Sequence, residues 1–197
     1  PLPDPCLDQL FREAHTAQRY LDKPVTVDQA RVIWDLAKMG PTSANMLPAR
    51  LVWCLSQDSR DALAELALAS NAGKIRAAPA AVIIGMDLDF HEQLPWLYPP
   101  APTFKQLFEG ADKEALRRDN ALRNSSLQGA YFILAARALG LGVGPMSGFD
   151  AAAVDAAFFA DQPRVRSNFI ATFGYADPAT FHPRSPRPDF ETFSRIV

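Results

Sequence analysis

A long helical pattern between residues 112 and 139 constrains the fold more than any other stretch of the chain. At about 1.5 Å per residue, it predicts a helix roughly 40 Å long. From Leu127 to Leu139 only Gln128 and Arg137 are strongly polar, so this half of the helix is apolar on nearly all sides. Such a helix must be buried on most of its surface, either in the core of one chain or between two subunits.

A polar belt lies just before this apolar half. It comprises Asn120, Arg123, Asn124, Ser125 and Ser126. Polar groups on a buried helix need hydrogen-bonding partners. We therefore expect the belt to face a second subunit, a ligand or water.

The remaining patterns predict a small sheet flanked by helices. Strands are expected where the chain is β-branched and apolar, and helices where apolar residues recur every three to four positions. The order of these elements is not a regular alternation of strand and helix, which favours an α+β class. We expect one domain over residues 1–197, with strands at 50–55, 80–86 and 166–175 and further helices at 5–20, 26–39, 58–69 and 150–159.

The helix over residues 26–39 has the clearest predicted boundaries. Thr26 and Gln29 have the spacing of a capping box, in which each side chain satisfies a backbone N–H of the other residue. Gly40 stands where a C′ glycine ends many helices. We therefore expect this helix to end in a left-handed glycine.

Composition and charge argue against several classes of binding partner. The net charge of −2 and the lack of long Lys/Arg clusters argue against a nucleic-acid or anionic-membrane partner. No apolar run is long and charge-free enough to span a bilayer. Cys6 and Cys54 stand alone, which favours a reduced, cytoplasmic protein, and the three histidines lack the spacing of a zinc site.

The segment Pro41–Pro48 can neither continue the preceding helix nor pair fully in a sheet, because its two prolines lack N–H donors. It places Thr42, Ser43 and Asn45 in an array that can bind something flat or polar. A helix-to-strand turn made of turn-forming residues is the alternative.

An arm of about residues 90–110 interleaves aromatic side chains, among them Trp96 and Phe104, with four prolines. This segment is too rich in proline for regular structure and too aromatic to be fully solvated. It predicts a lid packed over a ligand, or an arm that packs on a neighbouring subunit.

The glycine-rich stretch from Gly140 to Phe149 is not a dinucleotide fingerprint. Pro145 and Ser147 stand where the third glycine of that motif would fall, and no strand precedes the glycines. We expect a turn instead, in which the backbone N–H groups of Ser147 and Gly148 can approach a planar acceptor closely.

Four dispersed pieces of the chain together suit a flavin. The ring requires N–H donors at N5 and O4, together with an amide and a cation at its pyrimidine edge. The N–H groups of Ser147 and Gly148 suit the first task. Asn71 and Lys74, in a stretch that is typical of a flexible loop, suit the second.

The flavin's phosphate requires cationic or hydroxyl donors. The chain offers them in two places. One is a polar corner with His15, Thr16 and Arg19, and the other is a proline-punctuated tail with Arg184 and Arg187.

In this order and spacing, the motifs resemble the nitroreductase family of FMN-dependent oxidoreductases along nearly the whole chain. The resemblance rests on Gly-Pro-Thr-Ser-Ala-Asn from Gly40, Asn71-x-x-Lys74, Gly-Pro-Met-Ser-Gly-Phe-Asp from Gly144, and Phe-Gly-Tyr before the arginine tail. Arg-Asn-Ser-Ser from Arg123 and Pro186-Arg187 are similar to the malonic semialdehyde reductase (3-hydroxypropionate dehydrogenase) branch.

The resemblance implies a nitroreductase-like fold with a small, mostly antiparallel sheet and an intertwined homodimer. Each FMN would lie at the subunit interface. NADH or NADPH would reduce the FMN and leave, and the acceptor would then take its place. The acceptor implied by the branch is malonic semialdehyde, which would be reduced to 3-hydroxypropionate.

Site residues follow from the same resemblance. The phosphate is assigned to His15, Thr16, Arg19, Arg184 and Arg187. The ribityl chain and ring are assigned to Pro41, Thr42, Ser43, Asn45, Asn71, Lys74, Pro145, Met146, Ser147 and Gly148. Arg123, Asn124, Trp96 and Phe104 are candidates for substrate contacts. Because the flavin performs the chemistry, no side chain is assigned as a catalytic acid or nucleophile.

Two further functions remain open at this point. A nitroaromatic or quinone reductase would use the aromatic arm to stack planar acceptors. The other is a non-catalytic flavin-binding dimer. Ala14 and Gln18 stand where the family usually has basic residues, so the phosphate would be held more weakly here.

Overall fold

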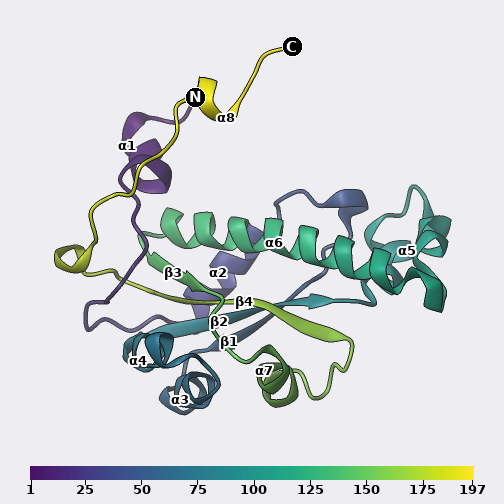
Figure 1. The fold of residues 1–197 in the computed structure, drawn as a ribbon, viewed down its shortest axis with the longest axis horizontal. Coiled ribbons are helices and arrows are strands. Elements are labelled where there is room, and N and C mark those ends of the chain that lie inside the picture. The colour runs from purple at the N-terminus through teal and green to yellow at the C-terminus, as the bar shows by residue number, and fades with distance from the viewer.

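A four-stranded antiparallel sheet forms the centre of the computed structural model, which describes residues 1–197 (Figure 1). The strand order is β1-β2-β4-β3. The three predicted strands and the α+β class are confirmed, and β3 is a fourth strand that the sequence did not indicate. The strands are β1 (Ala49–Cys54), β2 (Ala80–Asp87), β3 (Gly142–Met146) and β4 (Val165–Gly174).

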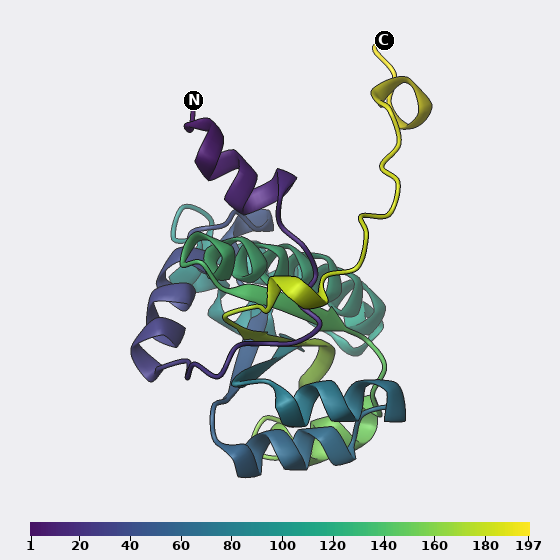
Figure 2. The ribbon, with the colours of Figure 1, turned by 90° about the vertical axis from the view of Figure 1, so that its left-hand side faces the viewer.

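Helices cover both faces of the sheet (Figures 1 and 2). Side chains of β2 alternate between the two faces, so that Val82 and Ile84 belong to one core and Ala81 and Ile83 to the other. On the first face lie α2 (Val27–Ala37) and α6 (Glu114–Ala138), and on the second lie α3 (Gln57–Glu65), α4 (Ala69–Ala77) and α7 (Ala151–Phe158).

Helix α6 matches the long helix expected from the sequence. Its inner side packs on the sheet through Phe132, Ala135 and Ala136. Its outer side leaves Leu116, Leu122, Leu127 and Tyr131 exposed. The core of one chain therefore covers only part of the apolar surface that the sequence predicts to be buried.

The aromatic arm packs on its own chain, beyond the end of the sheet at the right of Figure 1. Phe90, Leu94 and Phe108 form a third core with Met86 of β2 and Ala121 of α6. The expectation of no regular structure was wrong, because prolines in the first turn of short helices cost no hydrogen bond. These helices are a 3₁₀ turn (Phe90–Gln93), α5 (Leu94–Leu97) and a second 3₁₀ segment (Pro102–Phe108).

The N-terminal helix is shorter than expected. Helix α1 (Asp4–Leu7) continues as a π-helical turn (Asp8–Arg12) and stops there, although the sequence pattern extends to Tyr20. The chain then runs extended beside β3, where Thr16 forms a bridge with Val143 and the Ala17 N–H donates to the Val143 carbonyl at 3.0 Å. Pairing with a sheet edge outweighs the local helical pattern.

Two other segments differ from the expectation. The stretch around Asn71 and Lys74 is not a flexible loop but lies within α4, because packing of α4 on the sheet buries Ile75. Helix α3 begins at a Ser56 cap, rather than at residue 58 or 59, since the Ser56 side chain accepts from the Ser59 N–H.

The capping box of α2 is confirmed, but the role predicted for Gly40 is not. Thr26 and Gln29 make both reciprocal hydrogen bonds. Gly40 does not have the positive φ of a C′ glycine. A Cβ at this position would lie 2.4 Å from the Tyr131 ring, so the glycine permits α6 to pack closely.

None of the helices combines the length and the hydropathy that crossing a membrane requires. Two short elements complete the chain after β4. They are a 3₁₀ turn (Pro178–Thr180) and α8 (Phe190–Phe193), on a C-terminal segment that runs away from the body (Figure 2).

Candidate functional site

The predicted phosphate corner brings together residues from opposite ends of the chain. The His15 ring stacks on Phe181 with 4.9 Å between ring centroids. Arg184 Nη2 donates to the Ala14 carbonyl at 3.1 Å. The N-terminal segment and the C-terminal tail therefore meet at the start of β3, beside Thr16.

Arg19 and Arg187 are less directly involved in this corner. The Arg19 carbonyl accepts from the Asp177 N–H at 3.0 Å, which holds the extended segment against the chain after β4. The Arg187 guanidinium donates to the carbonyls of Ser185 and Pro186, its own neighbours, and is exposed. The structure thus brings His15, Thr16 and Arg184 together, and leaves Arg187 outside the group.

The second group forms where β3 ends. Asn71 Nδ2 donates to the Gly148 carbonyl at 3.0 Å, and the Leu68 N–H donates to the same oxygen at 2.9 Å. A Cβ on Gly148 would lie 2.7 Å from Asn71 Nδ2, so only glycine permits this approach. The amide of Asn71 is thereby fixed in orientation next to the Ser147–Gly148 backbone.

Three donors in this group have no partner in the chain. The N–H groups of Ser147 and Gly148 make no hydrogen bond, and Lys74, one helical turn after Asn71, makes neither a hydrogen bond nor an ion pair. Two adjacent backbone donors beside an oriented amide and a free ammonium form a site for a planar acceptor that gains negative charge. This donor set fits the isoalloxazine of FMN.

The Pro41–Pro48 segment forms a strained turn rather than an ordinary one. Ala44, Asn45 and Leu47 all have positive φ, at 47°, 50° and 38°. For residues with a Cβ, this conformation persists only where the surroundings hold it in place. Such strain marks candidate ligand sites.

Hydrogen bonds to two other elements, and one hydrogen bond within the turn, hold this turn. The Ser43 N–H donates to Asn124 Oδ1 of α6 at 2.8 Å, and Asn45 Nδ2 donates to the Leu97 carbonyl of the arm at 2.8 Å. Within the turn, Thr42 Oγ1 accepts from the Leu47 N–H at 3.2 Å. The turn is therefore attached to α6 and to the arm.

The two predicted halves of the ring site lie apart in one chain. The Pro41–Pro48 turn leads into β1, whereas Ser147 and Gly148 follow β3. These strands are opposite edges of the sheet, and a spacing of about 4.8 Å between strands separates them by about 14 Å. One chain alone does not bring Thr42, Ser43 and Asn45 to Asn71 and Lys74.

The substrate candidates have different surroundings. Asn124 is only 1% exposed, and its amide is occupied by the Ser43 N–H and the Asn120 carbonyl, so its role here is structural and not substrate binding. Phe104 packs edge-on against Tyr98 and Phe108 within the arm. Arg123 and Trp96 are exposed, Trp96 to 74%, and remain accessible to a ligand or a partner.

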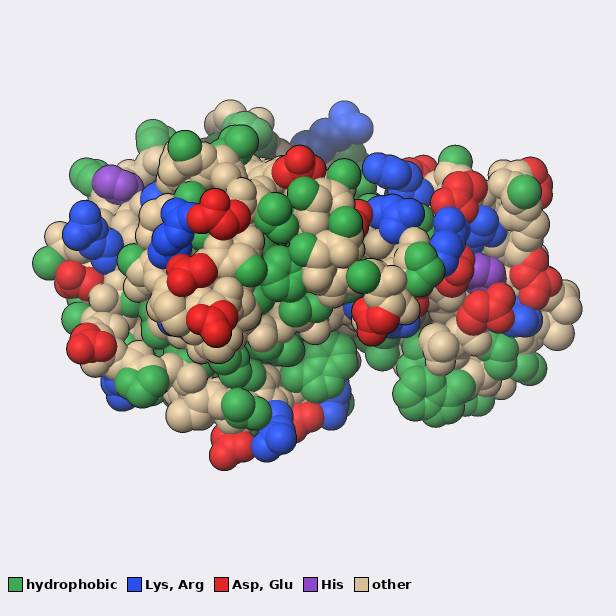
Figure 3. Space-filling view, turned by 90° about the horizontal axis from the view of Figure 1, so that it is seen from below, with side chains coloured by type: hydrophobic (Ala, Val, Ile, Leu, Met, Phe, Trp, Pro, Cys, Tyr) green, Lys and Arg blue, Asp and Glu red, His purple; other side chains and the backbone are tan.

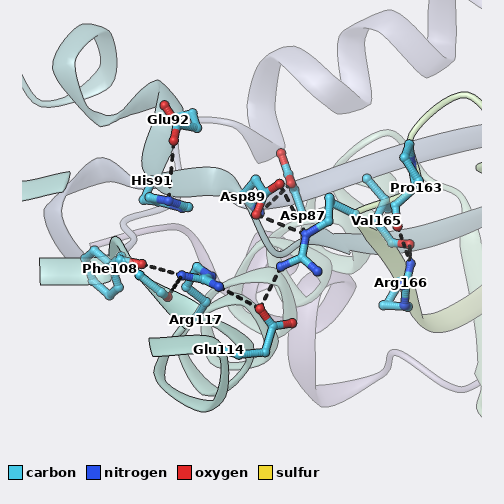
Figure 4. Close-up of polar contacts among 12 residues, drawn as sticks. Asp87, Asp89, His91, Glu92, Phe108, Glu114, Arg117, Pro163, Val165 and Arg166 are labelled. Carbon is cyan, nitrogen blue, oxygen red and sulfur yellow. Dashed lines mark hydrogen bonds and ion pairs between the residues drawn. The ribbon is translucent and has the colours of Figure 1, made fainter. Parts of the chain in front are cut away.

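An ionic network that the sequence did not reveal anchors the arm to α6 (Figure 4). Arg117, 8% exposed, donates to the carbonyls of Phe108 and Gly110 at 2.5 and 2.8 Å and to Glu114 at 2.7 Å. Arg164 joins Glu114 at 2.7 Å and Asp89 at 3.1 Å. Hydrogen bonds from Arg164 and Arg117 lower the pKa of Glu114 to about 2.

An apolar hollow of about 430 Å³ separates the arm from the β1 edge (Figure 3). Trp34 and Trp53 line it on the side of the sheet, and Trp96 and Leu97 line it on the side of the arm. Leu47 of the strained turn also contributes. The hollow can accept a flat apolar group next to that turn.

Comparison with known proteins agrees with this fold. The sequence profile of the Nitroreductase family matches residues 11–175. A Stenotrophomonas maltophilia (strain K279a) protein named "Putative NADH dehydrogenase/NAD(P)H nitroreductase" is 52% identical over 191 residues, which are 97% of this chain and 95% of that protein. A Burkholderia lata protein with the same name is 53% identical over 195 residues, 99% of this chain and 98% of that protein.

Solved structures show the same fold. The crystal structure of an Exiguobacterium sibiricum 255-15 protein, described as a nitroreductase in complex with FMN, superposes with a TM-score of 0.85 at 20% identity and 96% coverage of both chains. A Bacillus subtilis structure described as a nitroreductase superposes with a TM-score of 0.84 at 22% identity, covering 99% of this chain and all of that one. The family profile and the close relatives span nearly all of the sequence, and the chain therefore belongs to the nitroreductase family.

Proposed function

We propose that this protein is an oxidoreductase that binds FMN and uses NADH or NADPH as electron donor. The observation that carries the proposal is the pair of unpartnered N–H groups at Ser147 and Gly148 beside the oriented amide of Asn71. The printed names of the close relatives and the FMN in a structure of the same fold support it.

When bound, FMN would supply two-electron chemistry between the nicotinamide and a second substrate. The residues of this chain bind the flavin and orient its ring. Ser147 and Gly148 offer N–H donors to the acceptor edge of the ring, and Asn71 offers Oδ1, since its Nδ2 is occupied by the Gly148 carbonyl. The Lys74 ammonium stabilises negative charge at the pyrimidine edge.

We also propose that the working unit is a homodimer in which each flavin contacts both chains. The argument is the separation of the two ring-binding groups on opposite edges of the sheet. A second copy can place its Pro41–Pro48 turn over the Asn71–Gly148 group of the first. The exposed apolar side chains of α6 would be covered by the same association. So would Val27, Val32 and Leu36 of α2, and Met39 just after it.

Two classes of electron acceptor are proposed for the reduced flavin. Reduction of malonic semialdehyde to 3-hydroxypropionate is the narrower proposal, with Arg123 as the exposed cation available to a carboxylate. The second candidate is reduction of nitroaromatics or quinones. The hollow lined by Trp34, Trp53 and Trp96 favours it, because indole faces stack on flat apolar rings.

A visible absorption spectrum tests these proposals in sequence. The purified protein is titrated with FMN, reduced with NADH or NADPH without oxygen, and then given each acceptor. A flavin band that bleaches and returns with malonic semialdehyde supports the narrower function, and a return only with quinones or nitroaromatics supports the second. A bound flavin that NAD(P)H never bleaches points to a non-catalytic flavin-binding dimer. No uptake of flavin refutes the whole proposal.

A further inference from the structure

A buried histidine lies where the aromatic arm begins. His91 belongs to the first 3₁₀ turn of the arm and is 5% exposed. Its ring meets Phe90 edge-on, with 6.0 Å between the ring centroids, and lies tilted against Phe108, with 6.5 Å between them. Because Phe108 ends the second 3₁₀ segment of the arm, the two ends of the arm meet at this imidazole (Figure 4).

The surroundings of the imidazole suit only its neutral form. Nε2 of His91 lies 3.5 Å from a carboxylate oxygen of Glu92 and can carry the single proton of a neutral ring. Nδ1 is buried and makes no hydrogen bond. Protonation would place an unpaired N–H and a positive charge at Nδ1 among the aromatic rings of the arm, which is costly in an apolar environment. The closed arm therefore favours the neutral imidazole.

Charged groups of both signs surround this ring. Those that face it from the arm, from the residues beside the arm and from α6 are Asp89, Glu92, Lys105, Glu109 and Arg117. Each of the three carboxylates already pairs with a cation. Lys105 Nζ lies 3.3 Å from Glu92 and 3.2 Å from Glu109, and Arg164 lies 3.1 Å from Asp89. Burial accordingly lowers the pKa of His91 more than the carboxylates raise it.

Arg117 of α6 holds the arm closed at the same place. Its Nη1 donates to the carbonyls of Phe108 and Gly110 at 2.5 and 2.8 Å, and the ring of Phe108 is the one that packs on His91. A positive charge on the imidazole would therefore arise close to a guanidinium that is itself only 8% exposed. Like charges in a partly buried site repel each other. Protonation thus opposes the contact that attaches the arm to α6.

The rest of the molecule can remain folded when this contact is lost. Phe90 and Phe108 belong to the third core, which is distinct from the two cores that pack on the faces of the sheet. Local opening is expected where few contacts join a segment to the body.

We propose that His91 makes the arm sensitive to pH: when its imidazole is protonated, residues 94–108 detach from α6 while the sheet stays folded. Trp96 and Leu97 form the arm's side of the apolar hollow, so the detachment also opens that hollow. The pH dependence belongs to a single chain and requires no bound flavin.

Amide hydrogen exchange of the full-length protein at pH 7.5, 6.5 and 5.5 tests the proposal. Rates are expressed as protection factors, which removes the pH dependence of exchange in an unfolded chain. The protection of residues 94–108 should fall about three- to tenfold from pH 7.5 to 5.5, because one group with an ordinary pKa near 6.5 changes the opening equilibrium by at most about tenfold over this range. His91→Phe should abolish the fall, since phenylalanine keeps the ring contacts and has no titratable group. His182→Phe, in the exposed tail, is the matched control and should keep it.

Three results would overturn the proposal. One is constant protection of the arm in the wild type, and another is an undiminished fall in His91→Phe. The third is equal protection of the arm and of β4 at pH 5.5, which would show that only global unfolding exposes the imidazole. A local opening should instead leave the arm less protected than β4, and about 1 M urea should change its protection little, because little surface is exposed.

A measurement on the wild type covers the case in which His91→Phe does not fold. The ring protons of the histidines are followed by NMR as the pH is lowered. The His91 imidazole should titrate at a lower pH than the exposed His182, because the closed arm holds it neutral. Titration of His91 together with His182, or above it, would show that the arm does not resist protonation and that the proposal is wrong.

Discussion

At the scale of single residues, two glycines have opposite surroundings. Gly40 is buried against α6, and a Cβ there would lie 2.4 Å from the Tyr131 ring. Gly73 lies within α4, and a Cβ there would meet nothing within 4 Å. The same substitution should therefore have opposite effects at the two positions.

Gly40→Ala should lower the free energy of unfolding by about 1–3 kcal/mol, because the added methyl overpacks the contact with Tyr131. Gly73→Ala should raise it by about 0.5–1 kcal/mol, because alanine loses less backbone entropy in a helix. Urea unfolding of both variants measures the difference. Equal effects of the two substitutions would contradict the role assigned to Gly40.

His91 is the residue expected to make stability depend on pH. It is 5% exposed, and its Nδ1 is buried without a partner. Burial lowers the pKa of His91; Arg117 reinforces this shift, while the carboxylates of Glu92, Asp89 and Glu109 oppose it. In the folded state the imidazole is therefore neutral at pH values where the unfolded chain binds a proton.

Because the unfolded state binds more protons below about pH 6.5, stability should fall as the pH is lowered through this value toward the folded pKa. Each unit by which the pKa is lowered contributes about 1.4 kcal/mol. His91→Phe should remove this part of the pH dependence, whereas His182→Phe, in the exposed tail, should keep it. Urea unfolding at pH 7.5, 6.5 and 5.5 measures the effect, and parallel curves for His91→Phe and the wild type would refute the assignment.

At the scale of elements, the arm is attached to the body by few polar contacts. Arg117 holds the carbonyls of Phe108 and Gly110, where the arm ends, and Glu114 and Arg164 continue the network to Asp89. The rest of the attachment is the hydrogen bond from Asn45 to the Leu97 carbonyl and the aromatic core around Phe90 and Phe108. Loss of Arg117 should therefore loosen the arm and leave the sheet intact.

Arg117→Met should make amide hydrogen exchange in residues 94–108 about thirtyfold faster, which corresponds to about 2 kcal/mol for the lost hydrogen bonds to a charged group. Amides of β2 and β4 should exchange at the rate of the wild type. Arg118→Met is the matched control, since Arg118 is exposed and forms no ion pair. Similar exchange in both variants would show that Arg117 does not anchor the arm.

At the scale of the whole molecule, the C-terminal segment exposes large apolar side chains that nothing in the chain covers. Phe190, Phe193 and Ile196 are 57%, 79% and 89% exposed, and Figure 2 shows this segment away from the body. Apolar side chains held in water contribute nothing to the stability of one chain. In the proposed homodimer they can pack on the partner.

Deletion of residues 189–197 should therefore weaken dimerisation at least tenfold and leave the unfolding of dilute, monomeric protein unchanged. Sedimentation velocity over a dilution series measures the first effect. The full-length double variant Phe190→Ser, Phe193→Ser should reproduce most of it, because the apolar side chains and not the backbone are removed. Dimerisation equal to that of the wild type in both proteins would exclude the tail from the interface.

Much of the fold was accessible from local patterns. The helix over residues 26–39, the long helix α6 and the strands β1, β2 and β4 follow from periodicity, capping and β-branched runs, which act over a few neighbouring residues. The family was also accessible from the sequence, since its motifs occur along the chain in a fixed order. Predictions failed where a distant partner outweighed local preference, as in the N-terminal helix, α4 and the strand β3.

The amino-acid sequence by itself determined most of the elements, the fold class and the kinds of side chain available to a flavin. Only the tertiary structure decided which of these groups meet. It brought Arg184 to the Ala14 carbonyl, fixed the Asn71 amide against the Gly148 carbonyl, and placed the Pro41–Pro48 turn at the opposite edge of the sheet from Gly148. The physical reason is that local preference depends on nearby residues, whereas a binding site depends on pairings between segments far apart in the sequence, such as Arg184 with Ala14.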